Sequence, residues 1–451
     1  MVFSSLLFLF WFIPIFFAVY YILPARFRNT ALFIGSIIFY AWGEPKFLIL
    51  IFISIIVNYI AGILMHKSPK LVLTLALVFD FAMLFVFKYT GFFIGNINSI
   101  FGTSISDPAL SLPLGISFYT FQIASYVIDL YRGKIKACKN PLTLGTYLVM
   151  FPQLIAGPIV VYETVEAELK SRKITPSMVE EGIGTFIIGL SSKVLIANQV
   201  GALWNDLEGI GYERISMPLA WLGVVAYTLQ IYFDFNGYSL MAIGLGKMLG
   251  FNISRNFNNP YISRSLTEFW RRWHITLSTW FREYVYIPLG GNRKGKVRTF
   301  VNLFIVWFLT GFWHGAGWNF IIWGLFFFVF LSFEKLFLGK YLEKSVIFSR
   351  IYSLILIGLS WMIFAITDFE LLGQYFRKLF MPSFGDDVVY YLRNYGVVII
   401  LGCIFSTPFI GKWFEKVRRS AAGVVILLAL FVICVAYLAD ASYNPFLYFR
   451  F

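Results

Sequence analysis

Apolar residues run along this chain in long blocks that are separated by short polar loops. A helix needs roughly 20 apolar residues to cross a bilayer, and several of the blocks reach that length. We therefore expect an all-α polytopic membrane protein with about ten to twelve crossings. The expected apolar segments lie near residues 3–23, 30–42, 46–64, 71–88, 113–131, 143–162, 183–203, 216–236, 238–250, 299–313, 319–333, 350–367, 393–410 and 422–440.

The polar parts of the chain are too short to form a separate soluble domain, so residues 1–451 are expected to form one membrane-embedded domain. Hydrophobic residues make up 59% of the chain and charged residues 13%, whereas soluble domains carry about 25% charged residues. The net charge of +14 does not indicate nucleic-acid binding, because the basic residues gather in loops between apolar segments. These loops, 132–139, 293–298 and 412–419, are expected to face the cytoplasm, with the N-terminus outside.

The longest uncharged stretch contains a single histidine. No Asp, Glu, Lys or Arg occurs between Arg298 and Glu334, and His314 is the one residue there that can titrate near neutral pH. The stretch is too long for one straight crossing, so glycines at 311, 315 and 317 are expected to break it next to His314. An ionisable residue at such a place is a functional hypothesis by default.

The segment before this stretch, TEFWRRWHITLSTWFREYVY, predicts one amphipathic helix when it is read at 100° per residue. On that reading His274 shares a stripe with Arg271 and Arg282. Nearby cations are expected to depress the pKa of His274. His274 is therefore a second candidate for the site, and the alternative is a structural histidine bonded to a backbone carbonyl or a carboxylate.

Several polar residues interrupt other apolar blocks: Asp80, Gln122, Gln153, Asp234 and Asn236. Hydrogen bonds between helices are the simplest role for the first three. A carboxylate at this depth is costly unless it is paired, so Asp234 is expected to have a cationic partner, with Arg255 or Arg271 as possibilities. Prolines on both sides of Gln153 exclude a straight helix there.

Two histidines, buried polar groups and a broken helix indicate proton transfer. A neutral imidazole can take the proton of a hydroxyl while that hydroxyl attacks an acyl thioester. The sequence has no GxSxG motif. Cys138, Cys403 and Cys434 are interpreted as packing thiols, and His66 as an ordinary loop residue. No group of residues has metal-ligand spacing, so no metal and no bound cofactor are expected.

These residues resemble a known family. FWRRWHITLSTWFREYVYIPLGGNRKGK followed by GFWHGAGWNFIIWG is similar to the signature of membrane-bound O-acyltransferases, in particular the bacterial alginate O-acetyltransferase branch. Further similar motifs are LPLGISFYTFQIASYVIDLYRG, FPQLIAGPIV, YFDFNGYSLMAIGLGKMLGF and NFNNPYISRSLTEFW, so the resemblance covers about residues 113–324.

The resemblance implies a helical bundle around a central tunnel, with re-entrant and interfacial helices, in a bacterial cell membrane. It implies that an acyl group, most simply acetyl from acetyl-coenzyme A or an acyl carrier, passes to the hydroxyl of a cell-surface polysaccharide. His314 matches the catalytic histidine of the family and His274 its second motif histidine. A separate extracytoplasmic serine-hydrolase-like acetyltransferase is the expected partner. The residues expected to bind donor or substrate are Asp234, Asn236, Arg271, Trp313 and Asn319.

The chain departs from the alginate branch at two positions. Asn236 stands where that branch has Ser, and Leu240 where it has Asp; leucine there is similar to the D-alanyl-lipoteichoic-acid transfer protein. D-alanyl transfer from a carrier protein to teichoic acid is therefore an alternative. An alternative from another class is a transporter or flippase of a lipid-linked saccharide, which would use the same polar groups for binding.

Overall fold

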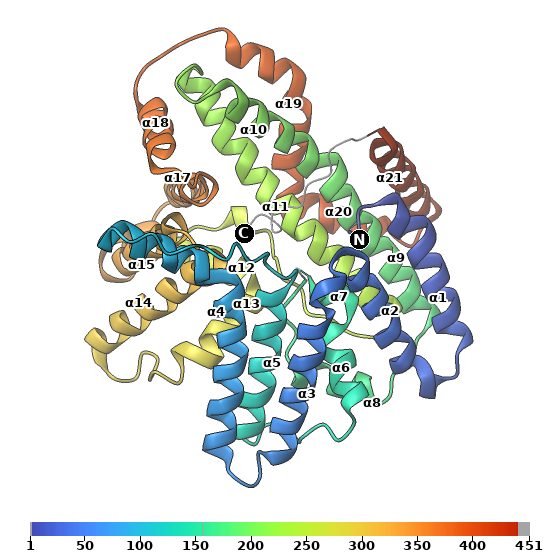
Figure 1. The fold of residues 1–451 in the computed structure, drawn as a ribbon. Helices are drawn as coiled ribbons and strands as arrows, with labels where there is room; N and C mark the ends of the chain where they lie inside the picture. Colours follow the sequence, from blue (N-terminus) through green and yellow to red (C-terminus); the bar gives the residue numbers. More distant parts are fainter. Residues whose placement is uncertain (1, 156, 441–451) are drawn as a thin grey trace. The chain divides into compact units, whose positions relative to one another are not determined.

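The computed structural model describes residues 2–155 and 157–440, and over these ranges the regular structure is helical, with no strand (Figure 1). The chain divides into two compact units. The first contains residues 1–186 and 241–254, and the second contains residues 187–240 and 255–451. We describe each unit by itself.

The helices of the first unit follow the apolar blocks closely. Prolines stand at the first residue of α4, α6 and α9, where the missing N–H is not needed by the helix. Pro45 separates the second and third apolar segments, as expected. The elements, in which η marks a 3₁₀ or π turn, are η1 Phe8–Phe12, α1 Ile13–Ile22, η2 Ala25–Phe27, α2 Arg28–Gly43, η3 Pro45–Phe47, α3 Leu48–Leu64, α4 Pro69–Phe101, α5 Ile116–Tyr131, α6 Pro141–Val149, α7 Phe151–Leu154, α8 Tyr162–Lys170 and α9 Pro176–Ser191.

The first unit is held together by apolar packing with a few buried polar contacts. α4 packs along α5 and α3, and α6 packs against α2 and α3 (Figure 1). The amide of Asn58 on α3 donates to Asp80 of α4 at 2.8 Å, and the amide of Gln153 donates to the carbonyl of Tyr147 at 2.7 Å. These two expected internal hydrogen bonds are confirmed. The side-chain amide of Gln122 is buried without a partner among the described residues.

The second unit contains the remaining helices. Its elements are η4 Ser192–Ala197, α10 Asn198–Ile210, α11 Met217–Met248, η5 Pro260–Ile262, α12 Leu266–Arg272, α13 Ile275–Phe281, η6 Arg282–Tyr286, α14 Gly295–His314, α15 Trp318–Phe333, η7 Glu334–Leu338, α16 Gly339–Leu342, α17 Val346–Ala365, α18 Phe369–Phe380, α19 Asp387–Phe405, α20 Pro408–Val417 and α21 Ala421–Asp440. The chain passes from one unit to the other within the carboxyl-terminal halves of α9 and α11.

α14 and α15 form a tight antiparallel hairpin in the second unit (Figure 1). A Cβ on Gly311 would overlap the carbonyl oxygen of Phe320, and one on Gly324 would overlap the carbonyl oxygen of Trp307. Small residues at such positions let two membrane helices approach closely. Gly311 was expected to break the chain, but it lies inside α14 and serves this contact instead.

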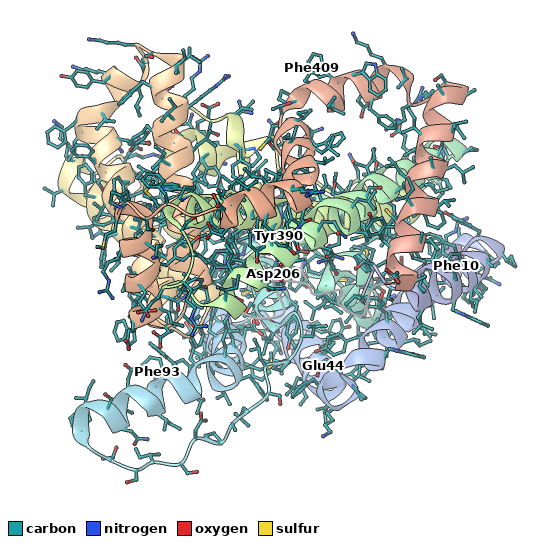
Figure 2. All side chains as sticks on the ribbon, turned by 90° about the horizontal axis from the view of Figure 1, so that it is seen from above. Phe10, Glu44, Phe93, Asp206, Tyr390 and Phe409 are labelled. Carbon is teal, nitrogen blue, oxygen red and sulfur yellow. The ribbon has the colours of Figure 1, made fainter. Side chains whose placement is uncertain are left out.

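Seven helices of the described chain are long and apolar enough to cross a membrane. They are Pro45–Leu64, Pro69–Phe101, Pro176–Ile210, Trp318–Leu342, Val346–Ala365, Asp387–Phe405 and Ala421–Asp440. α11 and α14 lie outside this set, although at 1.5 Å per residue both are long enough to reach across a hydrocarbon core of about 30 Å. Apolar side chains such as Phe10, Phe93 and Phe409 are exposed, as expected for surfaces that face lipid (Figure 2).

Candidate active site

The segment that was expected to form one long helix is broken at His274. α12 ends at Arg272 and α13 begins at Ile275, and His274 between them has a positive φ of 42°. The peptide N–H of Ile275 donates to the carbonyl of Asn256 at 2.9 Å, and the N–H of Asn258 donates to the carbonyl of Arg272 at 2.9 Å. The prediction of a continuous helix was wrong because an adjacent extended segment takes these backbone groups.

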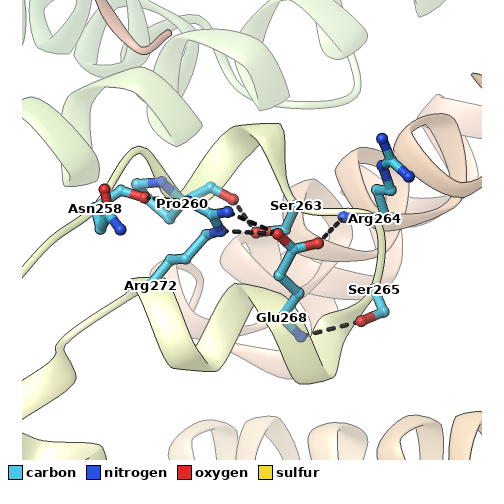
Figure 3. A network of polar contacts seen from close by, with 7 residues as sticks. All are labelled: Asn258, Pro260, Ser263, Arg264, Ser265, Glu268 and Arg272. Atoms are coloured by element: carbon cyan, nitrogen blue, oxygen red, sulfur yellow. Dashed lines mark hydrogen bonds and ion pairs between the residues drawn. The ribbon is translucent and has the colours of Figure 1, made fainter. Parts of the chain in front are cut away.

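A polar network fixes α12 to that extended segment (Figure 3). Glu268 accepts from Nε of Arg272 at 2.9 Å and from the backbone N–H of Arg264 at 2.9 Å. Arg272 also donates from Nη1 to the carbonyl of Asn258 at 3.0 Å, and Ser265 accepts from the N–H of Glu268 at 3.0 Å. Arg272 is therefore engaged with Glu268 and the Asn258 backbone.

The tautomer of His274 follows from its neighbours. Oδ1 of Asn256 accepts from the backbone N–H of Thr276 at 3.2 Å and from the Thr276 hydroxyl at 2.9 Å. An atom that accepts from a peptide N–H must be the amide oxygen. Nδ1 of His274, 3.1 Å from the same oxygen, must then be the protonated nitrogen. Nε2 carries a lone pair and is buried without a partner among the described residues.

The charge state of His274 follows from its burial. The ring is fully buried, and this burial lowers the pKa of His274 to about 3. The expected depression is confirmed, but its expected cause is wrong, because desolvation and not the neighbouring arginines produces it. His274 is neutral near pH 7 and presents Nε2 as a hydrogen-bond acceptor. The left-handed backbone costs an L-residue roughly 1–2 kcal/mol, so the surrounding contacts must hold it in place.

His314 occupies the last residue of α14, directly before the chain reverses into α15. Gly315 and Gly317 have extended backbones at the reversal, and a Cβ on Gly315 would overlap the ring of Phe320. The prediction that His314 lies at a chain reversal is confirmed. The carbonyls at the end of a helix favour a positive charge, which an imidazole acquires when it accepts a proton.

Aromatic rings surround His314. Its ring centroid lies 5.0 Å from that of Trp323, 5.3 Å from that of Phe364 and 4.9 Å from that of Trp313, and the ring is buried. Trp313 also contacts His274, at 6.1 Å between centroids. One tryptophan therefore contacts both histidines, and the structure brings three of the expected site residues together.

The other four expected site residues lie at different places in the second unit. Asn319 is buried and donates to the carbonyl of Phe364 at 3.2 Å, so it fixes one wall of the His314 environment. Asp234 forms a buried ion pair with Lys193 at 2.5 Å, which corrects the expectation of Arg255 or Arg271 as its partner. Asn236 is half-buried on α11, and Arg271 is exposed on α12.

Two residues at the site had not been singled out from the sequence. Asn256 orients His274 through a hydrogen bond. Its position directly before the turn-forming sequence FNNP could have indicated a residue that bonds to nearby backbone. Phe235 lies edge-on to His274 at 4.7 Å. In the sequence, Asp234 stands out by its charge. Nothing in the sequence distinguishes the adjacent Phe235 from the other aromatic residues of α11.

The arrangement suits acyl transfer chemistry. One buried imidazole at a helix end can accept a proton, and a second, neutral imidazole offers a lone pair in the same aromatic surroundings. Aromatic walls exclude water and strengthen the electrostatic interactions inside.

Comparisons with known proteins agree with these features. The model of the membrane-bound O-acyltransferase family matches residues 138–373, just over half of the chain. A probable alginate O-acetylase of Azotobacter vinelandii is 36% identical over 503 residues, covering 100% of both proteins. The peptidoglycan O-acetyltransferase of Helicobacter pylori is 37% identical over 365 residues, covering 72% of this chain and 68% of that protein.

A more distant relative also shares the central region. The teichoic acid D-alanyltransferase of Bacillus subtilis is 30% identical over 224 residues, covering 47% of this chain and 56% of that protein. The family match spans α12 to α15 and thus both histidines. The chain belongs to the membrane-bound O-acyltransferase family and is a membrane O-acyltransferase.

Proposed function

We propose that this enzyme moves an acetyl group from a cytoplasmic thioester donor, acetyl-coenzyme A or an acyl carrier, to a hydroxyl of a cell-surface polysaccharide. The observation that carries the proposal is the contact of two buried histidines with the same residue, Trp313. The full-length similarity to a probable alginate O-acetylase supports acetyl as the group and a polysaccharide as the acceptor.

In this proposal His314 is the general base. The acceptor hydroxyl attacks the thioester carbonyl carbon, a C–O bond forms and the C–S bond breaks. His314 takes the hydroxyl proton and returns it to the departing thiolate, so that the free thiol leaves. The position at the carboxyl end of α14 supports this role, because the helix end favours the imidazolium that forms.

We assign His274 a different role, that of a neutral hydrogen-bond acceptor. With a pKa of about 3, its ring is a weak base at pH 7. Its buried Nε2 lone pair can still accept a hydrogen bond from the attacking hydroxyl or from an amide of the donor. His274 would thus orient a reactant and leave the proton transfer to His314.

The direction of transfer and the partner belong to the same proposal. The basic residues 293–298 would face the cytoplasm and attract an anionic donor through their charge. The N-terminus would lie outside. A separate extracytoplasmic serine-hydrolase-like acetyltransferase would complete the transfer to the polysaccharide.

The test uses the purified full-length protein in lipid nanodiscs. Acetyl-labelled coenzyme A, a soluble polysaccharide acceptor and the extracytoplasmic partner that completes the transfer are supplied, and thiol release and labelled ester are both measured. We expect the wild type and His66→Ala to form thiol and ester, and His314→Ala to form neither while remaining folded. His66 is the matched control because it is exposed on a loop, where its Nδ1 lies 2.7 Å from the nearby Ile63 carbonyl oxygen.

Two further arms separate the alternatives. D-alanyl carrier protein replaces the acetyl donor in one arm, a choice that Leu240 and the D-alanyltransferase relative make necessary. Ester formation from D-alanine with none from acetyl would overturn acetyl as the transferred group. In the other arm a lipid-linked saccharide is supplied, and its movement across the membrane without thioester turnover would indicate a flippase.

A further inference from the structure

The second unit has a cavity of about 710 Å³ beside α12, separate from the two histidines. α12 contributes Trp270, α14 contributes Leu303 and Trp307, and the end of the α15–α16 helix contributes Leu331 and Leu342. The interior of the cavity is therefore apolar and aromatic, and its rim is charged. None of the residues of the proposed reaction except Arg271 lines it.

Three cations stand at the rim without an acidic partner among the described residues. Arg264, Arg271 and Lys335 are all exposed and line the cavity. Three carboxylates also line the cavity, and two of them already bond to other groups of the protein. Glu268 is paired with Arg272 at 2.9 Å, as Figure 3 shows.

Glu334 is the second carboxylate that already bonds to the protein. It is buried and accepts from the backbone N–H of Leu266 at 2.6 Å and from the N–H and hydroxyl of Thr267 at 3.1 and 2.8 Å. These neutral donors leave the charge of Glu334 in place, so the cations near the cavity, Arg264, Arg271, Arg272 and Lys335, outnumber its three carboxylates by one. The rim therefore carries an excess of positive charge that an anionic group can neutralise.

The wall of the cavity also contains a buried donor without an acceptor. The indole N–H of Trp270 has no hydrogen-bond partner among the described residues, and the side chain is 8% exposed. Its ring is held by Trp307 at 4.7 Å and by Phe327 at 4.9 Å between centroids. A buried N–H is normally satisfied, and an oxygen of a ligand in the cavity would satisfy this donor.

The surroundings of the cavity indicate the membrane surface. The candidate span Trp318–Leu342 ends here, and Leu336, Phe337 and Tyr341 near its end are 53%, 61% and 62% exposed. Aromatic and basic side chains at the end of a spanning helix mark the interface between hydrocarbon and headgroups. Leu331 and Leu342 are 11 residues apart along this helix, which is roughly 16 Å and about the depth of one leaflet.

We propose that this cavity binds one anionic phospholipid. The headgroup phosphate lies among Arg264, Arg271 and Lys335. An acyl chain packs against Leu303 of α14 and Leu331 of α15. The indole N–H of Trp270 donates to an ester oxygen of the same lipid. Because α12 ends directly before His274, the bound lipid braces the helix that sets the position of that ring.

Lipid retention measured by native mass spectrometry tests the proposal. Full-length protein is incubated in mixed micelles that contain equal amounts of phosphatidylglycerol and phosphatidylcholine. We expect phosphatidylglycerol to be retained preferentially by the wild type. Arg264→Gln and Lys335→Gln each lower this preference about fivefold, which is typical of one basic side chain at an anionic lipid surface. Lys340→Gln is the matched control, because Lys340 is exposed at the same helix end but does not line the cavity.

Two more variants test the interior of the cavity without a change of charge. Trp270→Phe removes the indole N–H, and Leu303→Trp fills the space for the acyl chain. Both are expected to reduce retention of phosphatidylglycerol. These variants change different walls, so retention can still be measured if one of them fails to fold.

Three outcomes would overturn the proposal. The first is equal retention of the two lipids by the wild type. The second is an equal loss of preference in Lys340→Gln and in the rim variants. The third is displacement of phosphatidylglycerol by soluble coenzyme A, which would assign the cavity to a soluble phosphate-bearing donor. The readout is binding and not turnover, so the result is independent of the acetyl-transfer proposal.

Discussion

The two buried histidines lie in different local structures. His274 is fixed by hydrogen bonds: Asn256 binds its Nδ1, and the ring lies in a break between two short helices. His314 lies at the end of a 20-residue helix and is enclosed by the rings of Trp323 and Phe364. In the proposed function the same side chain serves as a fixed hydrogen-bond acceptor in one place and as a proton acceptor at a helix end in the other.

The difference shows that burial alone does not define the role of a histidine. Both rings are buried, and the amide of Asn256 determines the tautomer of His274. Only His314 ends a long helix, whose carbonyls favour a positive charge. The predictions below test this contrast, beginning with the largest expected effect.

The largest effect is expected from replacement of the base. His314→Ala should lower kcat by about a thousandfold, because general base catalysis contributes roughly 10²–10⁴ in rate. His274→Ala should lower kcat/KM by only about tenfold, as expected for the loss of one orienting hydrogen bond. Acetyl-thioester turnover by the two variants measures the contrast. If the His274 variant were the more damaged of the two, the assignment of roles would be reversed.

The next effect concerns the buried ion pair between Lys193 and Asp234. Lys193→Met leaves the carboxylate of Asp234 buried opposite an apolar side chain, and should destabilise the protein by about 3 kcal/mol. The double variant Lys193→Met/Asp234→Leu should recover most of that loss. Thermal unfolding in detergent measures both. A double variant as unstable as the single one would mean that the pair is not an isolated electrostatic unit.

A smaller effect is expected at the chain reversal beside His314. Gly315→Ala places a methyl group against the ring of Phe320 and should cost about 2 kcal/mol in stability through overpacking. The matched control is Gly373→Ala on α18, where a Cβ would meet nothing within 4 Å and alanine should be tolerated or favourable. Equal unfolding temperatures for the two variants would show that the reversal can relax.

The smallest effect is the pH dependence that His274 contributes. Its pKa of about 3 in the folded protein lies below the ordinary value of 6.5, so the unfolded chain binds the proton first as the pH falls. The stability contributed by the neutral ring is complete above about pH 6.5. It declines progressively as the pH falls from 6.5 toward 3, because the unfolded chain gains the proton first.

The measurement compares the unfolding temperature of the wild type and of His274→Gln between pH 6.5 and 4. The variant should lose less stability on acidification, because glutamine does not titrate. Identical pH profiles for the two proteins would contradict a buried neutral histidine at this position.

The helical membrane fold was predictable from local properties of the chain. Long apolar blocks, prolines at helix starts and a low content of charge indicate membrane helices whatever the tertiary arrangement. The reversal after His314 was also predictable, because glycines follow it in an uncharged stretch. The break at His274 was not predictable, since its periodicity is that of a continuous helix and the competing hydrogen bonds come from Asn256 and Asn258.

The sequence by itself determined the class of fold, the family and the two histidines, because hydropathy and motif spacing are written along the chain. Only the tertiary structure decided that Asp234 pairs with Lys193, that Gly311 serves helix packing, and that Asn256 sets the tautomer of His274. The physical reason is that partners for buried polar groups are chosen by proximity in space. The local pattern shows that such a group needs a partner, but it does not contain the identity of that partner.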